Sequence, residues 1–284
     1  MAADSRECSS KIESKLNPFS DMKLASFEAL NNVERRACAK CKSSRKYYCY
    51  KCYVVVGIDR SLIPVVKLPL QVHIVKHQLE VDGKSTSSHA AIMAAENVVI
   101  HDFPDVPEFK SKEKVVLVYP CETALTLSQL GKQSNCETEN INQNIEEVVF
   151  IDSTWQQAHK IITDKRLENI QRIKIEDAKT YFWRTQRKPN TCLATIEAVY
   201  YFFKEYDKYI LEREYDGRYD NLLYLFAFQY QRVQQEQRKS KRRKTSSMTD
   251  KQACCQKSRK QVLFQTLLLK CFFQNICKFY LHTI

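Results

Sequence analysis

An alternation of short β-branched runs with helical patterns constrains the fold of this chain more than any other sequence feature. Runs rich in Val and Ile, bounded by polar segments, predict strands at 54–56, 70–75, 98–100, 115–119, 148–151 and 172–175. Helical patterns follow at 87–96, 123–130, 154–169, 194–207 and 219–238. Strands that alternate with helices form parallel sheets covered on both faces. We therefore predict an α/β domain with a mostly parallel sheet and flanking helices.

The scarcity of glycine narrows the kinds of cofactor site that this domain can contain. The chain has only 4 glycines, at positions 57, 83, 131 and 217. A Walker-type phosphate loop and a G-x-G-x-x-G fingerprint both need glycines a few residues apart, so both are excluded. A nucleotide-like cofactor would have to be held by another backbone arrangement.

Positive charge is concentrated in two segments. The net charge is +12, yet residues 35–51 contain seven Lys or Arg and no acid, and residues 232–260 contain 11 Lys or Arg and two acids. The intervening part, 52–231, is close to neutral. Localised positive patches favour a polyanionic partner such as nucleic acid.

The polarity of the chain ends sets the expected domain organisation. We expect a disordered segment at 1–20 and then a helix at 21–30, which is followed by a cysteine-rich module that ends at residue 53. The catalytic domain is expected at 54–235. The first residues lack the apolar stretch of a signal peptide. The polar stretch 131–146 is predicted to be a surface loop before a core strand.

Residues 236–284 are basic and then apolar. The run Arg238–Lys244 predicts a nuclear import signal or an RNA-contacting tail, with a solvated end and a cytoplasmic location as the alternatives. The stretch 261–284 is apolar but is interrupted by Lys270 and Lys278, so no stable membrane association is expected.

Four cysteines form a compact pattern, with two C-x-x-C pairs separated by seven residues. They are Cys38, Cys41, Cys49 and Cys52. This spacing predicts a tetrahedral four-cysteine zinc (Zn2+) site. Its role would be structural, because four thiolates leave no position for water. Lys42, Arg45 and Lys46 lie beside three tyrosines on the same module, a mixture that suits RNA phosphates and bases or, equally, a packed and solvated surface.

Hydroxyls, a carboxylate and aromatic residues follow several of the predicted strands. The first group is Lys84-Ser85-Thr86 with His89, the second is Tyr119-Pro120, and the third is Asp152-Ser153-Thr154-Trp155. A fourth group runs from Trp183-Arg184 past Lys188 to Thr195-Ile196-Glu197-Ala198. Open α/β sheets bind ligands at the carboxyl ends of their strands. Each group taken alone also fits a simple helix cap or core packing.

These groups resemble the signatures of the DTW-domain family, within the TDD superfamily. Asp152-Ser153-Thr154-Trp155 is similar to its D-x-T-W motif, and Lys84-Ser85-Thr86 with His89 to its K-S-T-x-x-H segment. Thr195-Ile196-Glu197-Ala198 resembles its closing S-T-x-E-A, and Cys38–Cys52 its zinc knuckles. The resemblance covers roughly residues 24–235 and is strongest to the eukaryotic members.

The resemblance implies a SPOUT-like α/β fold and an S-adenosyl-L-methionine donor. Its 3-amino-3-carboxypropyl group would move to N3 of a tRNA uridine, giving acp3U, with the D-loop as the expected region and methylthioadenosine as the other product. Asp152 is then the first candidate for the general base and Glu197 the alternative. The cofactor-binding candidates are Lys84, Ser85, Thr86, His89, Tyr119, Pro120, Thr154, Trp155, Arg184 and Thr195. The RNA-contact candidates are Lys42, Arg45, Lys46 and Lys188.

Four positions depart from the family pattern without removing a proposed acid, base or cation. Gln78 stands where H-P-x-E has proline, Ser153 where D-G-T-W has glycine, Cys121 where a small residue is usual, and Ala194 where S-T-x-E-A has serine. Ala194 removes one hydroxyl from the expected ligand set. Two other functions remain open, a SPOUT-type RNA methyltransferase and a non-catalytic zinc-ribbon RNA-binding protein.

Overall fold

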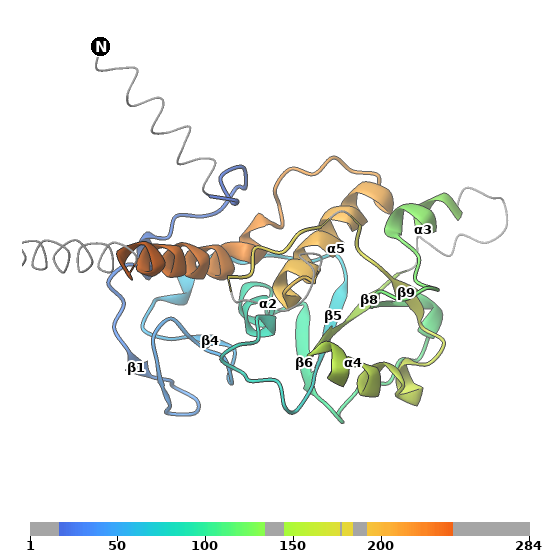
Figure 1. The fold of residues 1–284 in the computed structure, drawn as a ribbon, viewed down its shortest axis with the longest axis horizontal. Helices are drawn as coiled ribbons and strands as arrows, with labels where there is room; N and C mark the ends of the chain where they lie inside the picture. The colour runs from blue at the N-terminus through green and yellow to red at the C-terminus, as the bar shows by residue number, and fades with distance from the viewer. Residues whose placement is uncertain (1–16, 134–144, 177, 184–191, 241–284) are drawn as a thin grey trace, which may run out of the picture. The chain divides into compact units, whose positions relative to one another are not determined.

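The computed structural model describes residues 17–133, 145–176, 178–183 and 192–240 (Figure 1). Contacts divide the chain into one unit of residues 1–231 and a second of residues 232–284. In the second unit the described residues, 232–240, are helical. The predictions for residues 1–16, for most of the 131–146 loop and for the tail beyond 240 lie outside the described residues.

A five-stranded parallel sheet forms the centre of the first unit. Its strands are β5 (Gln71–Lys76), β6 (Val98–Asp102), β7 (Val115–Val118), β8 (Glu147–Asp152) and β9 (Gln171–Ile173). Their order across the sheet is β6-β5-β8-β7-β9, and every neighbouring pair is parallel. The predicted α/β class is therefore confirmed. Because all strands run the same way, their carboxyl ends lie along one edge.

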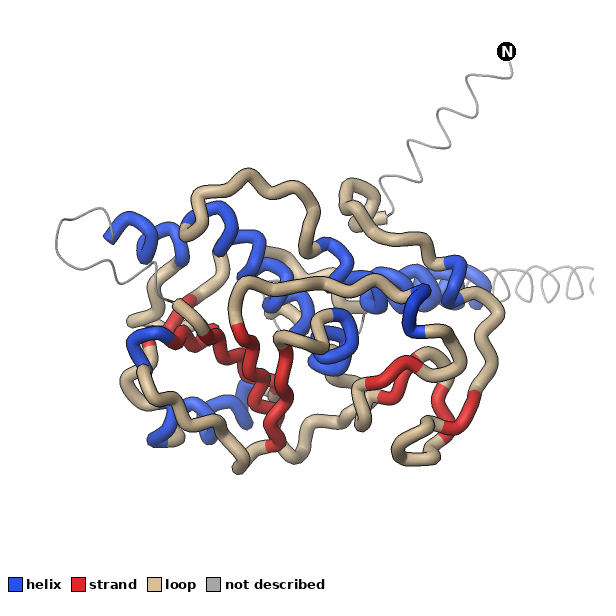
Figure 2. Tube along the Cα trace, turned by 180° about the vertical axis from the view of Figure 1, so that it is seen from behind, coloured by secondary structure: helices blue, strands red, loops and turns tan. Residues whose placement is uncertain are grey.

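Helices cover both faces of this sheet (Figures 1 and 2). Val72 and Ile74 of β5 face a core shared with α2 (Ser87–Met93), α5 (Thr195–Tyr209) and the turn η6 (Asp220–Leu223). Val75 and Val149 face the opposite core, which contains Ile161 of α4 (Trp155–Ile162) and Leu167 of η5 (Lys165–Leu167). This alternation follows from the two-residue period of a strand, and it explains why the strand sequences are apolar on both faces.

Helix α3 (Leu127–Gln133) packs against α5 at a glycine. A Cβ added to Gly131 would collide with the carbonyl oxygen of Tyr209. Only glycine therefore allows this close approach of the two helices.

The helix expected at 21–30 is wrong apart from the single turn η1 (Glu28–Leu30). The preceding residues are tied to η6 instead, because the Lys23 and Ala25 backbone N–H groups donate to the side chains of Asp220 and Asn221, at 2.7 and 2.8 Å. Side-chain acceptors from a distant segment replace the helical carbonyls. The described structure also begins earlier than expected, since Phe19 is buried against Phe226.

Two small hairpins precede the sheet. One pairs β1 (Arg36–Ala37) with β2 (Ser44–Arg45), and the other pairs β3 (Tyr48–Cys49) with β4 (Val54–Val55). The strand expected at 54–56 therefore belongs to the cysteine module and not to the central sheet. Val54 and Val55 find their strand partners, Cys49 and Tyr48, within seven residues of the chain.

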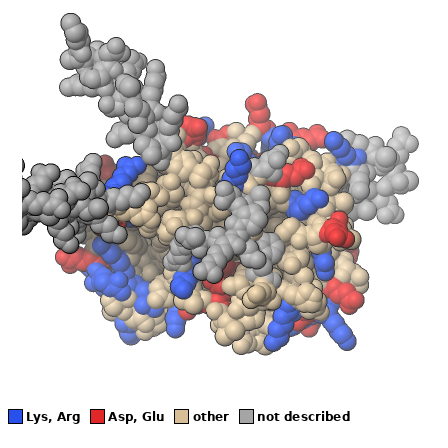
Figure 3. All heavy atoms as spheres, viewed as in Figure 1, with Lys and Arg blue, Asp and Glu red and all other residues tan. Residues whose placement is uncertain are grey.

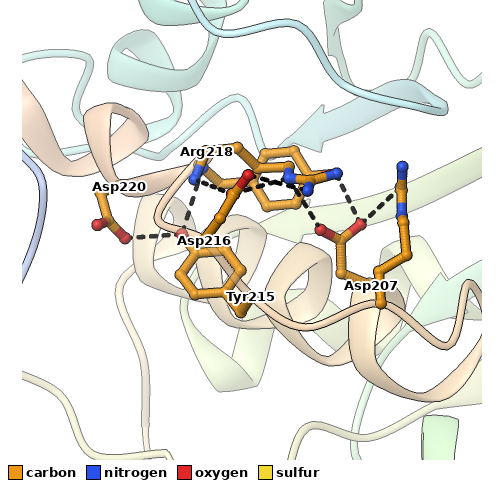
Figure 4. A network of polar contacts seen from close by, with 7 residues as sticks. Asp207, Tyr215, Asp216, Arg218 and Asp220 are labelled. Carbon is orange, nitrogen blue, oxygen red and sulfur yellow. Dashed lines mark hydrogen bonds and ion pairs between the residues drawn. The ribbon is translucent and has the colours of Figure 1, made fainter.

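A buried polar network fixes the segment after α5 (Figure 4). Asp207 is fully buried and pairs with Arg213 at 2.9 Å and with Arg218 at 3.4 Å. Asp220 accepts hydrogen bonds from the hydroxyls of Tyr200 and Tyr215. Paired in this way, the two buried carboxylates hold residues 207–220 against the helical core.

Among the described residues, no helix has the length and apolar character needed to span a membrane.

Candidate active site

Two separate segments bring hydroxyl groups to Asp152, at the carboxyl end of β8. Ser85, which precedes α2, donates its hydroxyl to Oδ2 at 2.5 Å, and Thr195, the first residue of α5, donates to Oδ1 at 2.7 Å. Thr86 accepts the Ile196 backbone N–H at 3.2 Å and joins the two helix starts. Asp152 is only 4% exposed. Hydroxyls of the described residues thus occupy two of the four lone-pair positions of its carboxylate.

A buried cation lies on the neighbouring strand. Lys76 ends β5 in register with Asp152 of β8 and Asp102 of β6. Its Nζ contacts Asp82 at 2.7 Å and Asp102 at 3.0 Å. Burial opposes the charged form of Lys76, but these hydrogen bonds outweigh it and raise its pKa above the ordinary value. The ammonium therefore stays charged and holds the loop that carries Asp82.

Glu197 lies beside this site but is engaged on both oxygens. It accepts hydrogen bonds from the Thr180 hydroxyl at 2.6 Å, from the Tyr181 N–H at 2.6 Å and from the Ala194 N–H at 2.8 Å. It is 1% exposed, and burial raises its pKa. These contacts tie the 180–181 segment to the start of α5 and occupy both carboxylate oxygens of Glu197.

His89 lies inside α2 and contacts the cysteine module. Gln229 donates to the Tyr48 hydroxyl at 2.5 Å, and the oxygen of that hydroxyl lies 2.7 Å from His89 Nε2, within hydrogen-bonding distance. The other ring nitrogen of His89 is Nδ1. This Nδ1 and the neighbouring Ser88 hydroxyl are buried and have no hydrogen-bond partner within the described part of the chain. Unpaired buried polar atoms in the K-S-T-x-x-H segment fit a site that a polar ligand completes.

The burial of His89 predicts a loss of stability in mild acid. Burial lowers its pKa to about 3, whereas the unfolded chain takes up this proton near pH 6.5. The contribution to stability is therefore full above pH 6.5 and is lost as the pH falls toward 3. Between pH 7.5 and 5.5 we expect a loss of about 1.4 kcal/mol from this residue.

The measurement is the free energy of unfolding at both pH values, for the wild type and for His89→Gln. The glutamine keeps an acceptor for Tyr48 but does not titrate, so its decrease should be smaller by that amount. Zinc content is followed at both pH values to exclude metal loss. An equal decrease in both proteins would contradict the prediction.

The remaining predicted cofactor residues lie at the same edge of the sheet or outside the description. Tyr119 is half-buried and Pro120 exposed, directly after β7, and Thr154 is the N-cap of α4. Lys84 lies in the loop after β5, next to Ser85. Arg184, Lys188 and the side chain of Trp155 lie outside the described residues.

The four cysteine sulfurs form a cluster with the dimensions of a metal site. All four Sγ atoms lie within 4.8 Å of one another, and those of Cys41 and Cys49 are 3.6 Å apart. Sulfurs arranged tetrahedrally around zinc at about 2.3 Å lie about 3.8 Å apart. Hydrogen bonds with Ser43 lower the pKa of Cys41 to about 6, while burial raises that of Cys52 to about 12. The donor set fits zinc, whose charge would hold all four groups as thiolates.

The same module carries the predicted RNA-contact residues. The Arg45 guanidinium lies 4.1 Å from the centre of the Tyr50 ring, and the Lys46 ammonium lies 5.3 Å from that of Tyr47. Lys42 donates to the Ala39 carbonyl at 2.9 Å. Figure 3 shows Lys and Arg side chains gathered over this part of the surface, while both signs of charge are interspersed elsewhere.

Two features of the site were missed by sequence reasoning. The position of Lys76 in the sequence could have indicated its place in the site. A lysine that directly follows the apolar run of a buried strand falls at the ligand-binding edge of the sheet. No sequence pattern indicated the contact between Tyr48 and His89, since tertiary packing brings together residues that are 41 positions apart.

Comparisons with known proteins identify the family of this chain. The DTW domain model matches residues 46–234. A Xenopus laevis protein named tRNA-uridine aminocarboxypropyltransferase 1 is 41% identical over 69% of this chain and 79% of its own length. The Xenopus tropicalis protein of that name is 39% identical over 75% and 85% of the two chains, and the Homo sapiens protein is 36% identical over 76% and 84%. No solved structure matched significantly. The motifs around Asp152, the match over most of the chain and these relatives together show that the chain belongs to the DTW-domain family.

Proposed function

We propose that this protein is a tRNA-uridine aminocarboxypropyltransferase. In this proposal it transfers the 3-amino-3-carboxypropyl group of S-adenosyl-L-methionine to N3 of a uridine in the D-loop of tRNA. The names of the relatives support the reaction. The two hydroxyls that contact the Asp152 carboxylate, those of Ser85 and Thr195, support the assignment of the reaction to this site. The donor, when bound, supplies a carbon activated by the adjacent sulfonium.

We assign to Asp152 the removal of the N3 proton of uridine. N3–H of uridine is a weak acid, so a carboxylate that removes its proton makes N3 a nucleophile. N3 then bonds to the terminal carbon of the aminocarboxypropyl chain, the bond from that carbon to sulfur breaks, and methylthioadenosine leaves with the electron pair. Ser85 and Thr195 hold the carboxylate in one orientation. Positioning is decisive, because three carbons on sulfur compete for attack.

The donor's polar end has partners in the same segment. Its carboxylate suits the hydroxyl of Ser88 and, in the tautomer with its proton on Nδ1, the ring of His89; both atoms are buried and without a partner among the described residues. Lys84 and Arg184 are the cationic candidates, and Tyr119 and Trp155 the aromatic candidates for the sulfonium. The tRNA backbone suits the acid-free segment 35–51, with Lys42, Arg45, Lys46 and Lys188 as contacts.

Analysis of the products tests this function directly. The purified protein is incubated with the donor and with tRNA from cells that lack it. We expect methylthioadenosine and acp3U in equal amounts. S-adenosylhomocysteine with a methylated nucleoside would instead identify a methyltransferase. Retained tRNA binding with neither product would identify a binding protein.

Nuclear import through the run Arg238–Lys244 is also proposed. Arg238 and Lys239 are exposed, and the residues beyond 240 lie outside the described part. Fluorescent fusions with and without this run are the measurement. An unchanged distribution between nucleus and cytoplasm would reject the signal.

A further inference from the structure

The loop after β5, residues 77–85, is pinned to the proposed base at both ends. At its start, the His77 N–H donates to the backbone oxygen of Asp152 at 3.0 Å. At its end, the Ser85 hydroxyl donates to the Asp152 carboxylate at 2.5 Å. Any group that this loop presents is therefore held at a fixed place relative to the proposed base.

Contacts within the loop and beneath it restrict its middle as well. The Glu80 N–H donates to the His77 oxygen at 2.9 Å, and the Lys84 N–H to the Val81 oxygen at 2.7 Å, which makes two successive turns. Between them, Asp82 is held by Lys76. A Cβ on Gly83 would lie 3.6 Å from the Tyr50 ring, so the loop also lies against the cysteine module.

This pinned loop exposes two apolar side chains. Leu79 is 73% exposed and Val81 is 53% exposed. Isolated exposed apolar residues are common on protein surfaces. These two are close in sequence on a loop that is held through His77, Asp82, Gly83 and Ser85. A loop that is anchored to the proposed base and presents apolar side chains has the form of a contact surface.

The chemistry of the reaction selects the partner that these side chains suit. N3 lies on the pairing edge of uridine, so the base must be unpaired and turned toward Asp152 before its proton can be removed. Bases displaced from a stack are held by apolar or aromatic side chains, and apolar wedges keep neighbouring bases apart. The acid-free module that contacts this loop through Tyr50 supplies charge suited to the phosphates nearby.

The geometry points to Leu79 and Val81 as an apolar wedge that packs against the bases beside the target uridine and keeps that uridine out of the stack. The inference rests on the proposed function, because it assumes that a tRNA uridine is the acceptor. It assigns to the pinned loop a role in substrate presentation that is separate from binding of the donor.

The test is the double variant Leu79→Ser/Val81→Ser, with Leu62→Ser as the matched control. Leu62 is 61% exposed on η2 (Arg60–Leu62), away from the pinned loop in sequence. At saturating donor, the double variant should lower kcat/KM for tRNA by about 10-fold. Its affinity for S-adenosyl-L-methionine and its melting temperature should match those of the wild type, and the control should keep all three values.

The salt dependence of tRNA binding provides a second readout. Loss of an apolar contact should weaken binding without changing the slope of log K against log salt, whereas Arg45→Gln should reduce that slope by about one. An unchanged kcat/KM in the double variant would overturn the inference, and so would a loss of donor affinity, which would place the loop on the donor instead. If the wild type transfers nothing to tRNA, the proposed function fails. The effect of the double variant on tRNA binding then still decides whether the loop contacts RNA.

Discussion

Asp152→Asn is expected to lower the turnover number for transfer to tRNA by about 10²–10⁴-fold, the usual contribution of a positioned general base. The amide is nearly isosteric with the carboxylate but cannot accept the N3 proton. Its neighbours should tolerate the change, because the hydroxyls of Ser85 and Thr195 donate or accept with equal ease. The measurement is single-turnover formation of acp3U, with tRNA affinity and melting temperature recorded in parallel. Both of these should stay close to the wild-type values.

Glu197→Gln is the matched control for a second buried carboxylate. Glu197 accepts three hydrogen bonds, two of them from backbone N–H groups, so its loss should appear as a lower melting temperature. The chemical step should fall far less than in Asp152→Asn. The opposite pattern, with turnover lost in Glu197→Gln at unchanged stability and retained in Asp152→Asn, would make Glu197 the base.

Strands were predictable here because burial on both faces leaves a strong signal in sequence. The run at 148–151 is apolar at every position, since Val149 and Phe150 face different cores. The expected helix at 21–30 failed for the complementary reason. The segment has a helical pattern of apolar residues, but the side chains of Asp220 and Asn221 accept hydrogen bonds from its backbone N–H groups instead. Nothing in the local sequence reveals a partner almost 200 residues away.

The proposed site was predictable to the extent that a parallel sheet made it so. Ser85, Asp152 and Thr195 come from three segments, and all three follow or face strand ends, which a parallel sheet gathers at one edge. The different hydrogen bonding of the two carboxylates could not be predicted from the sequence. It depends on which of them is saturated by backbone donors, and these come from residues 181 and 194 through the path of the chain.

Loss of the metal is expected to disable the transferase through the pinned loop and α2. The cysteine module carries Tyr48, which forms a hydrogen bond with His89 of α2, and Tyr50, which faces Gly83 of the pinned loop. The module has almost no core of its own, with Cys38, Cys49 and Val56 as its buried apolar residues. Metal binding in such small modules supplies most of their folding free energy. Without zinc, both contacts should be lost.

Cys49→Ser is the variant that tests this coupling, because Cys49 is buried in the cluster. We expect fewer than about 0.2 zinc atoms per chain, since a structural zinc site needs all four ligands. We also expect a lower melting temperature and at least a tenfold weaker affinity for S-adenosyl-L-methionine, roughly 1.4 kcal/mol. Tyr48→Phe separates the effect of zinc binding from the effect of the contact with His89. It removes only the hydroxyl that reaches His89, so it should keep its zinc and still bind the donor more weakly.

Cys121→Ser is the matched cysteine control. Cys121 lies outside the cluster, half-buried beside Thr123 and Arg172, and its replacement should leave zinc content and melting temperature unchanged. Zinc content measured on freshly purified wild type should be one atom per chain. A Cys49→Ser protein that lacks zinc yet binds the donor like the wild type would show that the module and the cofactor segment are independent. The contacts of Tyr48 and Tyr50 would then serve packing alone.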